Sequence, residues 1–137
     1  MNNELIPIQF NKIMQSHSYT VFILGTPEKR FAIYTAPHVG KNIQKQLAKQ
    51  KKARPHVSDL IHAIFQGLEI HLIQVVITDL QDTVYFSRLF VEQMTDKKRK
   101  ILEIDARPSD SLALAILNEV PIYCTQEVWE RVLPLDE

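Results

Sequence analysis

The 137-residue sequence is poor in the features that mark secreted, membrane-spanning or disulfide-stabilised proteins. Its single cysteine, Cys124, lies in an apolar run and has no second cysteine with which to form an intramolecular disulfide. No stretch of eighteen apolar residues occurs, and the N-terminus, Met1-Asn2-Asn3-Glu4, lacks the basic start and apolar run of a secretory signal. We therefore expect a cytoplasmic protein with no membrane partner, in which Cys124 belongs to the core.

The sequence also has no net charge, with 16 basic and 16 acidic residues, but these charges are unevenly distributed. Residues 41–100 carry a net charge of +5, and residues 101–137 carry −6. Such asymmetry fits a basic nucleic-acid surface, a complementary contact between copies of the chain, or two solvated faces. Charge alone favours the third interpretation.

Hydrophobic periodicity indicates one α+β domain over residues 1–137, since 45% of the residues are hydrophobic and only three are glycine. Strands are expected at 5–10, 19–24, 30–34, 70–80, 84–91 and 101–105, with a charged loop at 96–100. Helices are expected to begin at Pro37, near Ser58, near Pro108 and at Thr125 or Gln126. Because the strands come in consecutive runs, we predict a mainly antiparallel sheet with helices packed on one face, rather than a doubly wound parallel sheet.

The predicted elements repeat. Three strands and two helices are followed by the same five elements, and an offset of 71 residues aligns Ile33-Tyr34-Thr35-Ala36-Pro37 with Ile104-Asp105-Ala106-Arg107-Pro108. We therefore predict an internal duplication of a three-strand, two-helix unit.

The densest group of polar residues lies where the last predicted long strand meets a helix, and includes Asp105, Arg107 and Asp110. An arginine beside a helix N-terminus can bind a phosphate, and two carboxylates can hold Mg²⁺ or Mn²⁺. Asp59 follows a similar Arg-Pro sequence earlier in the chain. Ordinary helix capping and ion pairing explain the same residues, so the pattern alone does not establish a site.

A second candidate surface is basic. Lysines recur every four residues on the helix predicted from Pro37, and further basic residues follow it; the predicted nucleic-acid-binding strip comprises Lys41, Lys45, Lys49, Lys52 and Arg54. A solvated outer helix face is the alternative. The tyrosines Tyr19, Tyr34 and Tyr85 fall near or in strands and are expected in the core, and the five histidines have no zinc-ligand spacing.

The segment Ile104-Asp105-Ala106-Arg107-Pro108-Ser109-Asp110-Ser111-Leu112-Ala113-Leu114-Ala115, followed by Val120-Pro121-Ile122-Tyr123, resembles the bifunctional nuclease domain family. The resemblance extends over roughly residues 19 to 133. It implies an α+β fold with a duplicated unit, an oligomeric protein, most simply a dimer, and, as in some members, degradation of both DNA and RNA.

Three positions depart from the family's usual pattern. Val39 stands where the family has an acidic residue, and Ser58 and Thr78 stand where histidines precede an aspartate. If those positions are catalytic, the resemblance implies an inactive protein.

Two hypotheses follow. In the first, a nuclease cleaves phosphodiester bonds with a divalent cation on Asp105 and Asp110, Arg107 on the phosphate, and Asp59 orienting water or the metal. In the second, a non-catalytic oligomeric binding or regulatory module retains the junction for folding, with Asp105 or Arg107 in a desolvated ion pair.

Overall fold

The computed structural model describes residues 4–50 and 54–135 and contains seven strands and four helices in these residues. The strands are β1 (Leu5–Gln15), β2 (Thr20–Gly25), β3 (Arg30–Thr35), β4 (Ile70–Gln81), β5 (Val84–Thr95), β6 (Lys98–Ala106) and β7 (Ile122–Thr125). The helices are α1 (Pro37–Leu47), α2 (Val57–Gly67), α3 (Pro108–Asn118) and α4 (Gln126–Arg131).

All seven strands form one sheet in the order β3-β2-β1-β7-β4-β5-β6. Every neighbouring pair is antiparallel except β4 and β7, which are parallel. The predicted α+β class with a mainly antiparallel sheet is confirmed. The strand β7 was not predicted; its four residues join the first three strands to the last three.

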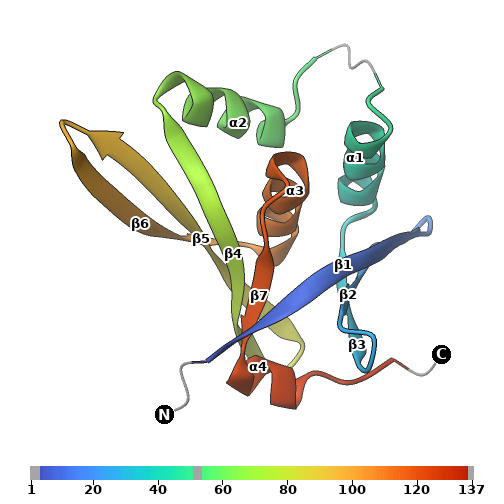
Figure 1. Cartoon of the computed structure of the whole chain (residues 1–137). Coiled ribbons are helices and arrows are strands. Elements are labelled where there is room, and N and C mark those ends of the chain that lie inside the picture. Colours follow the sequence, from blue (N-terminus) through green and yellow to red (C-terminus); the bar gives the residue numbers. More distant parts are fainter. Residues whose placement is uncertain (1–3, 51–53, 136–137) are drawn as a thin grey trace.

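The long hairpins have tight turns. Strands β4 and β5 pair antiparallel, and Asp82 adopts a positive φ of 57° in their turn. The predicted charged loop at 96–100 is wrong, because only Asp96 and Lys97 form a turn, both with positive φ, and β6 begins at Lys98. Two consecutive left-handed residues are the geometry that joins twisted antiparallel strands most tightly. Figure 1 shows the resulting β5–β6 hairpin, whose turn projects to the left of the helices.

Helices α1, α2 and α3 gather on one side of the molecule, whereas α4 lies apart and packs against β4, β7 and β1 (Figure 1). Both α1 and α3 begin with the predicted proline, and Thr125 caps α4 by accepting a hydrogen bond from the Val128 amide (3.2 Å). The apolar residues of α2 are only partly covered: Ile61 and Phe65 pack against the core, while Leu60, Ile64 and Leu68 are exposed.

The core runs through both halves of the sheet. Strand β2 is buried along its whole length, and Phe31 of β3 stacks on Tyr85 of β5 with ring centroids 5.8 Å apart. Cys124 is fully buried in β7, as predicted, and its burial raises the pKa of the thiol to about 12.

The order of elements in the second half is three strands, α3, β7 and α4, so an extra strand separates its two helices. The internal duplication therefore stays a prediction. Among the described residues, no helix combines the length and the hydrophobicity of a membrane-spanning segment.

Candidate functional site

The start of α3 is fixed by two buried serines. The Ser87 hydroxyl on β5 donates to the carbonyl oxygen of Ala106, the last residue of β6, at 2.6 Å. The Ser111 hydroxyl, in the first turns of α3, lies 2.7 Å from the Ser87 hydroxyl and donates to it, because the Ser87 proton is already used. Both serines are completely buried. This pair of serines joins β5 to α3, so the residues that lead from β6 into α3 hold a defined position.

Arg107 occupies the N-cap position between β6 and α3, with extended backbone angles, and Pro108 follows at the first helical position. The Arg107 Nε lies 3.2 Å from Asp110 Oδ2, which forms an i,i+3 ion pair. The Arg107 side chain is 80% exposed, so the desolvated pair considered for this residue is wrong. An exposed pair of this kind contributes less than about 1 kcal/mol and leaves the guanidinium accessible to a ligand.

A groove of about 810 Å³ lies beside this junction. Its walls come from four segments that are far apart in sequence: β3, the β4–β5 turn, the start of α3, and the chain after α4. The polar residues in this lining include Arg107, Ser109 and Arg131, with Tyr34, Tyr85 and Asp82. A groove of this volume accommodates a ligand the size of a nucleotide.

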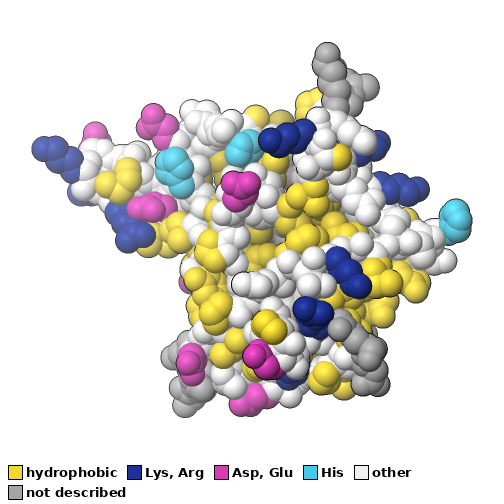
Figure 2. Space-filling view, turned by 45° about the vertical axis from the view of Figure 1, so that its right-hand side comes forward, with side chains coloured by type: hydrophobic (Ala, Val, Ile, Leu, Met, Phe, Trp, Pro, Cys, Tyr) yellow, Lys and Arg dark blue, Asp and Glu magenta, His cyan; other side chains and the backbone are white. Residues whose placement is uncertain are grey.

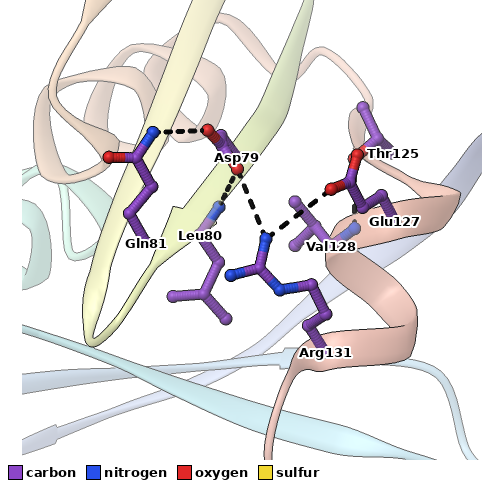
Figure 3. A network of polar contacts seen from close by, with 7 residues as sticks. All are labelled: Asp79, Leu80, Gln81, Thr125, Glu127, Val128 and Arg131. Carbon is purple, nitrogen blue, oxygen red and sulfur yellow. Dashed lines mark hydrogen bonds and ion pairs between the residues drawn. The ribbon is translucent and has the colours of Figure 1, made fainter.

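Arg131, at the end of α4, was not predicted as a site residue. Its Nη1 lies 3.6 Å from Asp79 Oδ1 and 3.7 Å from Glu127 Oε1, and its side chain is 43% exposed (Figure 3). Asp79 is itself held in place, since its two oxygens accept hydrogen bonds from the Leu80 amide (2.8 Å) and the Gln81 side chain (2.9 Å). The network holds the Arg131 side chain in place, and Arg131 is one of the residues that line the groove.

Asp105 does not join this site. It is exposed on β6 opposite Arg88 in the sheet register, whereas the next residue, Ala106, pairs with Ser87 on the face that α3 covers. Side chains alternate between the two faces of a strand, so Asp105 points to the face opposite α3 and Asp110. The two carboxylates predicted to share a metal therefore lie on different sides of the sheet. Within the described part of the chain, no three acidic, histidine or cysteine side chains form a metal-binding group.

Asp59 has a local role. Its Oδ2 accepts a hydrogen bond from the His56 amide at 2.8 Å, which caps the N-terminus of α2. Asp59 does not line the groove beside α3. The structure therefore supports the capping interpretation for Asp59, and the arrangement does not bring it to Arg107 or Asp110.

The basic strip is only partly helical. Lys41 and Lys45 are exposed on α1, but the helix ends at Leu47, and Lys49 lies beyond it with a φ of 54°. Arg54 is exposed before α2, and Lys52 lies outside the described residues. Figure 2 shows dark-blue Lys and Arg side chains at the upper right, where α1 lies, and a separate group at the left-hand tip of the β5–β6 hairpin.

Two tyrosines expected in the core are on the surface. Tyr34 is 64% exposed at the edge strand β3 and lines the groove, and its ring packs edge-to-face on exposed Tyr19 at 5.3 Å. Tyr85 is partly buried as expected, and burial raises the pKa of its hydroxyl. Sequence alternation does not distinguish Tyr34 from a core residue, because its exposure depends on β3 being the last strand of the sheet.

The three positions that depart from the family pattern have structural roles here. Val39 packs against the core, and the Ser58 hydroxyl accepts a hydrogen bond from Gln46 Nε2 at 2.8 Å, which ties α2 to α1. Thr78 lies at an irregularity in the pairing of β4 with β5. None of these three residues lines the groove.

Comparison with known proteins identifies the family. The sequence pattern of the bifunctional nuclease domain matches residues 22–133, and the chain belongs to that family. Two uncharacterized proteins of Mycobacterium tuberculosis, from strains CDC 1551 / Oshkosh and ATCC 25618 / H37Rv, are each 35% identical to the chain over 75 residues. The match covers 55% of this chain and only 42% of each relative.

Proposed function

We propose that the protein is a nuclease-like enzyme that binds the phosphodiester backbone of DNA or RNA in the groove beside α3. The observation that carries this proposal is the convergence of Arg107 and Arg131 on one groove from two separate elements. Guanidinium groups bind phosphate oxygens through two parallel hydrogen bonds, and the amides at the start of α3 add donors. Membership in the bifunctional nuclease domain family supports the same ligand class.

The rest of the groove suits a nucleotide. Tyr34 offers an exposed ring on which a base can stack, and Tyr85 and Ser109 provide hydroxyl groups deeper in the lining. Helix α1 begins two residues after Thr35, which lines the groove, so Lys41 and Lys45 continue the path of a bound strand along α1. Arg54 extends the same basic surface towards α2.

The groove is not strongly basic, because Asp82 lines it and carboxylates already contact both arginines. A bound phosphate must compete with Asp110 for Arg107, and with Asp79 and Glu127 for Arg131. We therefore expect modest affinity that falls steeply as salt concentration rises.

The residues present do not fit the metal site predicted from the sequence, because Asp105 and Asp110 lie on different faces of the sheet. Metal dependence stays a prediction, which a comparison of cleavage with Mg²⁺, with Mn²⁺ and with EDTA tests directly.

A second candidate function is a non-catalytic nucleic-acid-binding or regulatory module. It is favoured by Asp59, which caps α2, and by Val39 and Ser58, which replace family acidic and histidine residues and support packing. In this case the groove binds nucleic acid but no preparation cuts it.

The decisive experiment combines binding and cleavage on labelled single-stranded and double-stranded DNA and RNA. Arg107→Ala/Arg131→Ala is compared with Arg88→Ala, a matched control whose arginine is exposed on β5 and pairs with Glu103 outside the groove (3.6 Å). We expect at least about a tenfold loss of binding in the double variant and none in the control. Equal binding in all three proteins would contradict the groove, and binding without cleavage would establish the second function.

We also propose that the protein acts as a homo-oligomer in the cytoplasm, as the sequence predicts. Charge asymmetry supports self-association, since the basic residues of 41–100 complement the acidic residues of 101–137. The mass measured by analytical ultracentrifugation at several concentrations tests this proposal.

A further inference from the structure

Strand β6 is exposed along nearly its whole length. β6 is the last strand in the sheet order and pairs with β5 on one side only, among the described strands. Every residue from Lys98 to Asp105 is exposed, including the aliphatic side chains of Ile101 (48%), Leu102 (48%) and Ile104 (38%). A long edge strand with exposed aliphatic residues is a template for pairing with another strand.

The charges on β6 favour one orientation of a strand that pairs with its outer edge. Its first three residues, Lys98, Arg99 and Lys100, are basic, whereas Glu103 and Asp105 near its end are acidic. Figure 2 shows this basic end as dark-blue side chains at the left-hand tip of the molecule. A second β6 in parallel orientation would oppose like charges, but in antiparallel orientation each basic end would lie beside an acidic end.

We propose that the protein forms a two-fold symmetric dimer in which β6 pairs antiparallel with β6 of a second copy. The two seven-stranded sheets then become one continuous sheet. The contact is isologous, so it closes at two copies and covers the outer edge of β6 in each copy. The nuclease proposal and this one are independent, because the dimer would form whether or not the groove binds nucleic acid.

The register follows from the faces of the strand. Directly opposite residues in an antiparallel pair share a face of the sheet. One residue of β6 must therefore lie directly opposite its own copy, with the symmetry axis running between the two. Centring the axis on Leu102 places Arg99 opposite Asp105 twice, and Leu102 opposite Leu102. Centring it on Ile101 places Arg99 opposite Glu103 instead.

Existing contacts favour the Leu102 register. Glu103 already lies 3.6 Å from Arg88, whereas Asp105 has no ion-pair partner among the residues that the structure describes. The Leu102 register therefore supplies a partner to the carboxylate that lacks one. This register also brings Leu102 into contact with Leu102 of the second copy. Leu102 lies opposite the buried Val91 of β5, so this contact lies on the face of the sheet that carries the core.

Charge exchange tests the interface. Arg99→Asp would oppose two carboxylates, and Asp105→Arg would oppose two guanidinium groups, so each should weaken dimerisation at least about tenfold. The double variant Arg99→Asp/Asp105→Arg restores opposite charges and should recover most of the affinity. Because Arg99 also pairs with Glu92, circular dichroism must first show that each variant is folded. A monomer at every concentration, or a dimer that single reversals leave unchanged, would overturn the proposal.

Disulfide trapping tests the register separately. We expect Leu102→Cys to form an intermolecular disulfide under mild oxidation, since the two sulfur atoms would lie across the symmetry axis. The native Cys124 provides little background because it is completely buried. Efficient crosslinking by Ile101→Cys with none by Leu102→Cys would overturn the Leu102 register, and no crosslinking by either variant would overturn pairing through this edge.

Discussion

The protein contains two junctions in which a strand leads through a proline into a helix, and they differ in what they expose. At both, the residue before the proline is extended, with φ and ψ of −62° and 148° at Ala36 and −67° and 145° at Arg107. Each helix start is tied to the middle strand of the preceding three by a completely buried hydroxyl, Thr20 for α1 and Ser87 for α3.

The difference lies in the residues around these hydroxyls. At the first junction the Gly40 amide donates to Thr20 Oγ1 at 3.1 Å, and Val39 packs against the core, so the helix start is closed by packing. At the second junction the exposed Arg107 and Asp110 surround the same kind of anchor. Buried hydroxyls therefore build both junctions, whereas ligand binding is a separate property of the exposed residues that the second junction carries.

The largest expected effect comes from filling the space at the first junction. A Cβ on Gly40 would lie 2.3 Å from Gln15 Oε1 and 2.5 Å from the Thr20 methyl group. We expect Gly40→Val to lower the free energy of unfolding by about 3 kcal/mol, because an overpacked site must displace the helix or its anchor. Urea denaturation measures the change.

Gly67→Ala is the matched control, since nothing lies within 4 Å of an added Cβ at the end of α2. Its effect should be neutral or stabilising by up to about 1 kcal/mol, because alanine has the higher helix propensity. Equal destabilisation by the two variants would show that Gly40 does not close the junction.

The anchor of the second junction should have the next largest effect. Ser87→Ala leaves the Ser111 hydroxyl and the Ala106 carbonyl oxygen without their buried partner, which should cost about 2 kcal/mol. In the double variant Ser87→Ala/Ser111→Ala the two losses should be less than additive, because neither hydroxyl is left alone. Additive losses in a double-mutant cycle would contradict direct coupling of the serines.

Local sequence signals specify most of the strands and helices. Runs of β-branched residues predict β2 and β4, and Pro37 and Pro108 predict the starts of α1 and α3, because these signals are local. Strand β7 is too short for a local signal, and β6 includes Lys98 to Lys100 because pairing with β5 outweighs their weak strand propensity. Pairing between strands that are distant in sequence therefore determines β7 and the start of β6, which the local signals did not predict.

The same distinction explains the candidate site. Arg107 could be selected from sequence because it precedes a helix-starting proline. Arg131 could not, because its position depends on the packing of the chain after α4 near β3, where the Leu135 amide donates to the Arg30 carbonyl oxygen at 2.8 Å. Tyr34 and Asp105 occupy equivalent positions under the 71-residue offset, yet only Tyr34 lines the groove.

Strand β7 joins the halves that carry the two junctions, and its buried thiol predicts a pH dependence. The pKa of Cys124 is raised to about 12 in the folded protein, so the unfolded chain loses the thiol proton at lower pH. Stability from this group is complete below the unfolded pKa, near 9, and is lost as pH rises towards 12. Burial also raises the pKa of Tyr85, so its contribution has the same sign.

We therefore expect the free energy of unfolding to fall with pH above about 9, by at most about 1.4 kcal/mol per unit for each group. Thermal or urea unfolding of Cys124→Ala across this range should show a smaller slope than the native chain. An unchanged slope would mean that Cys124 does not titrate differently in the two states.

The smallest stability effect should come from the exposed part of the second junction. Arg107→Ala removes an ion pair that is exposed to solvent, so we expect it to change the free energy of unfolding by less than about 0.5 kcal/mol. The same variant should weaken nucleic-acid binding severalfold, because it removes one of the two guanidinium groups in the groove.

Arg107→Lys sharpens this result, since it keeps the charge but loses the planar pair of donors that binds a phosphate in two places. We expect its affinity to lie between those of the native chain and Arg107→Ala, with no change in stability. A loss of stability as large as that of Ser87→Ala, with binding unchanged, would instead show that Arg107 stabilises the junction and does not bind the ligand. The two junctions would then differ in the residues that build them and not in what they bind.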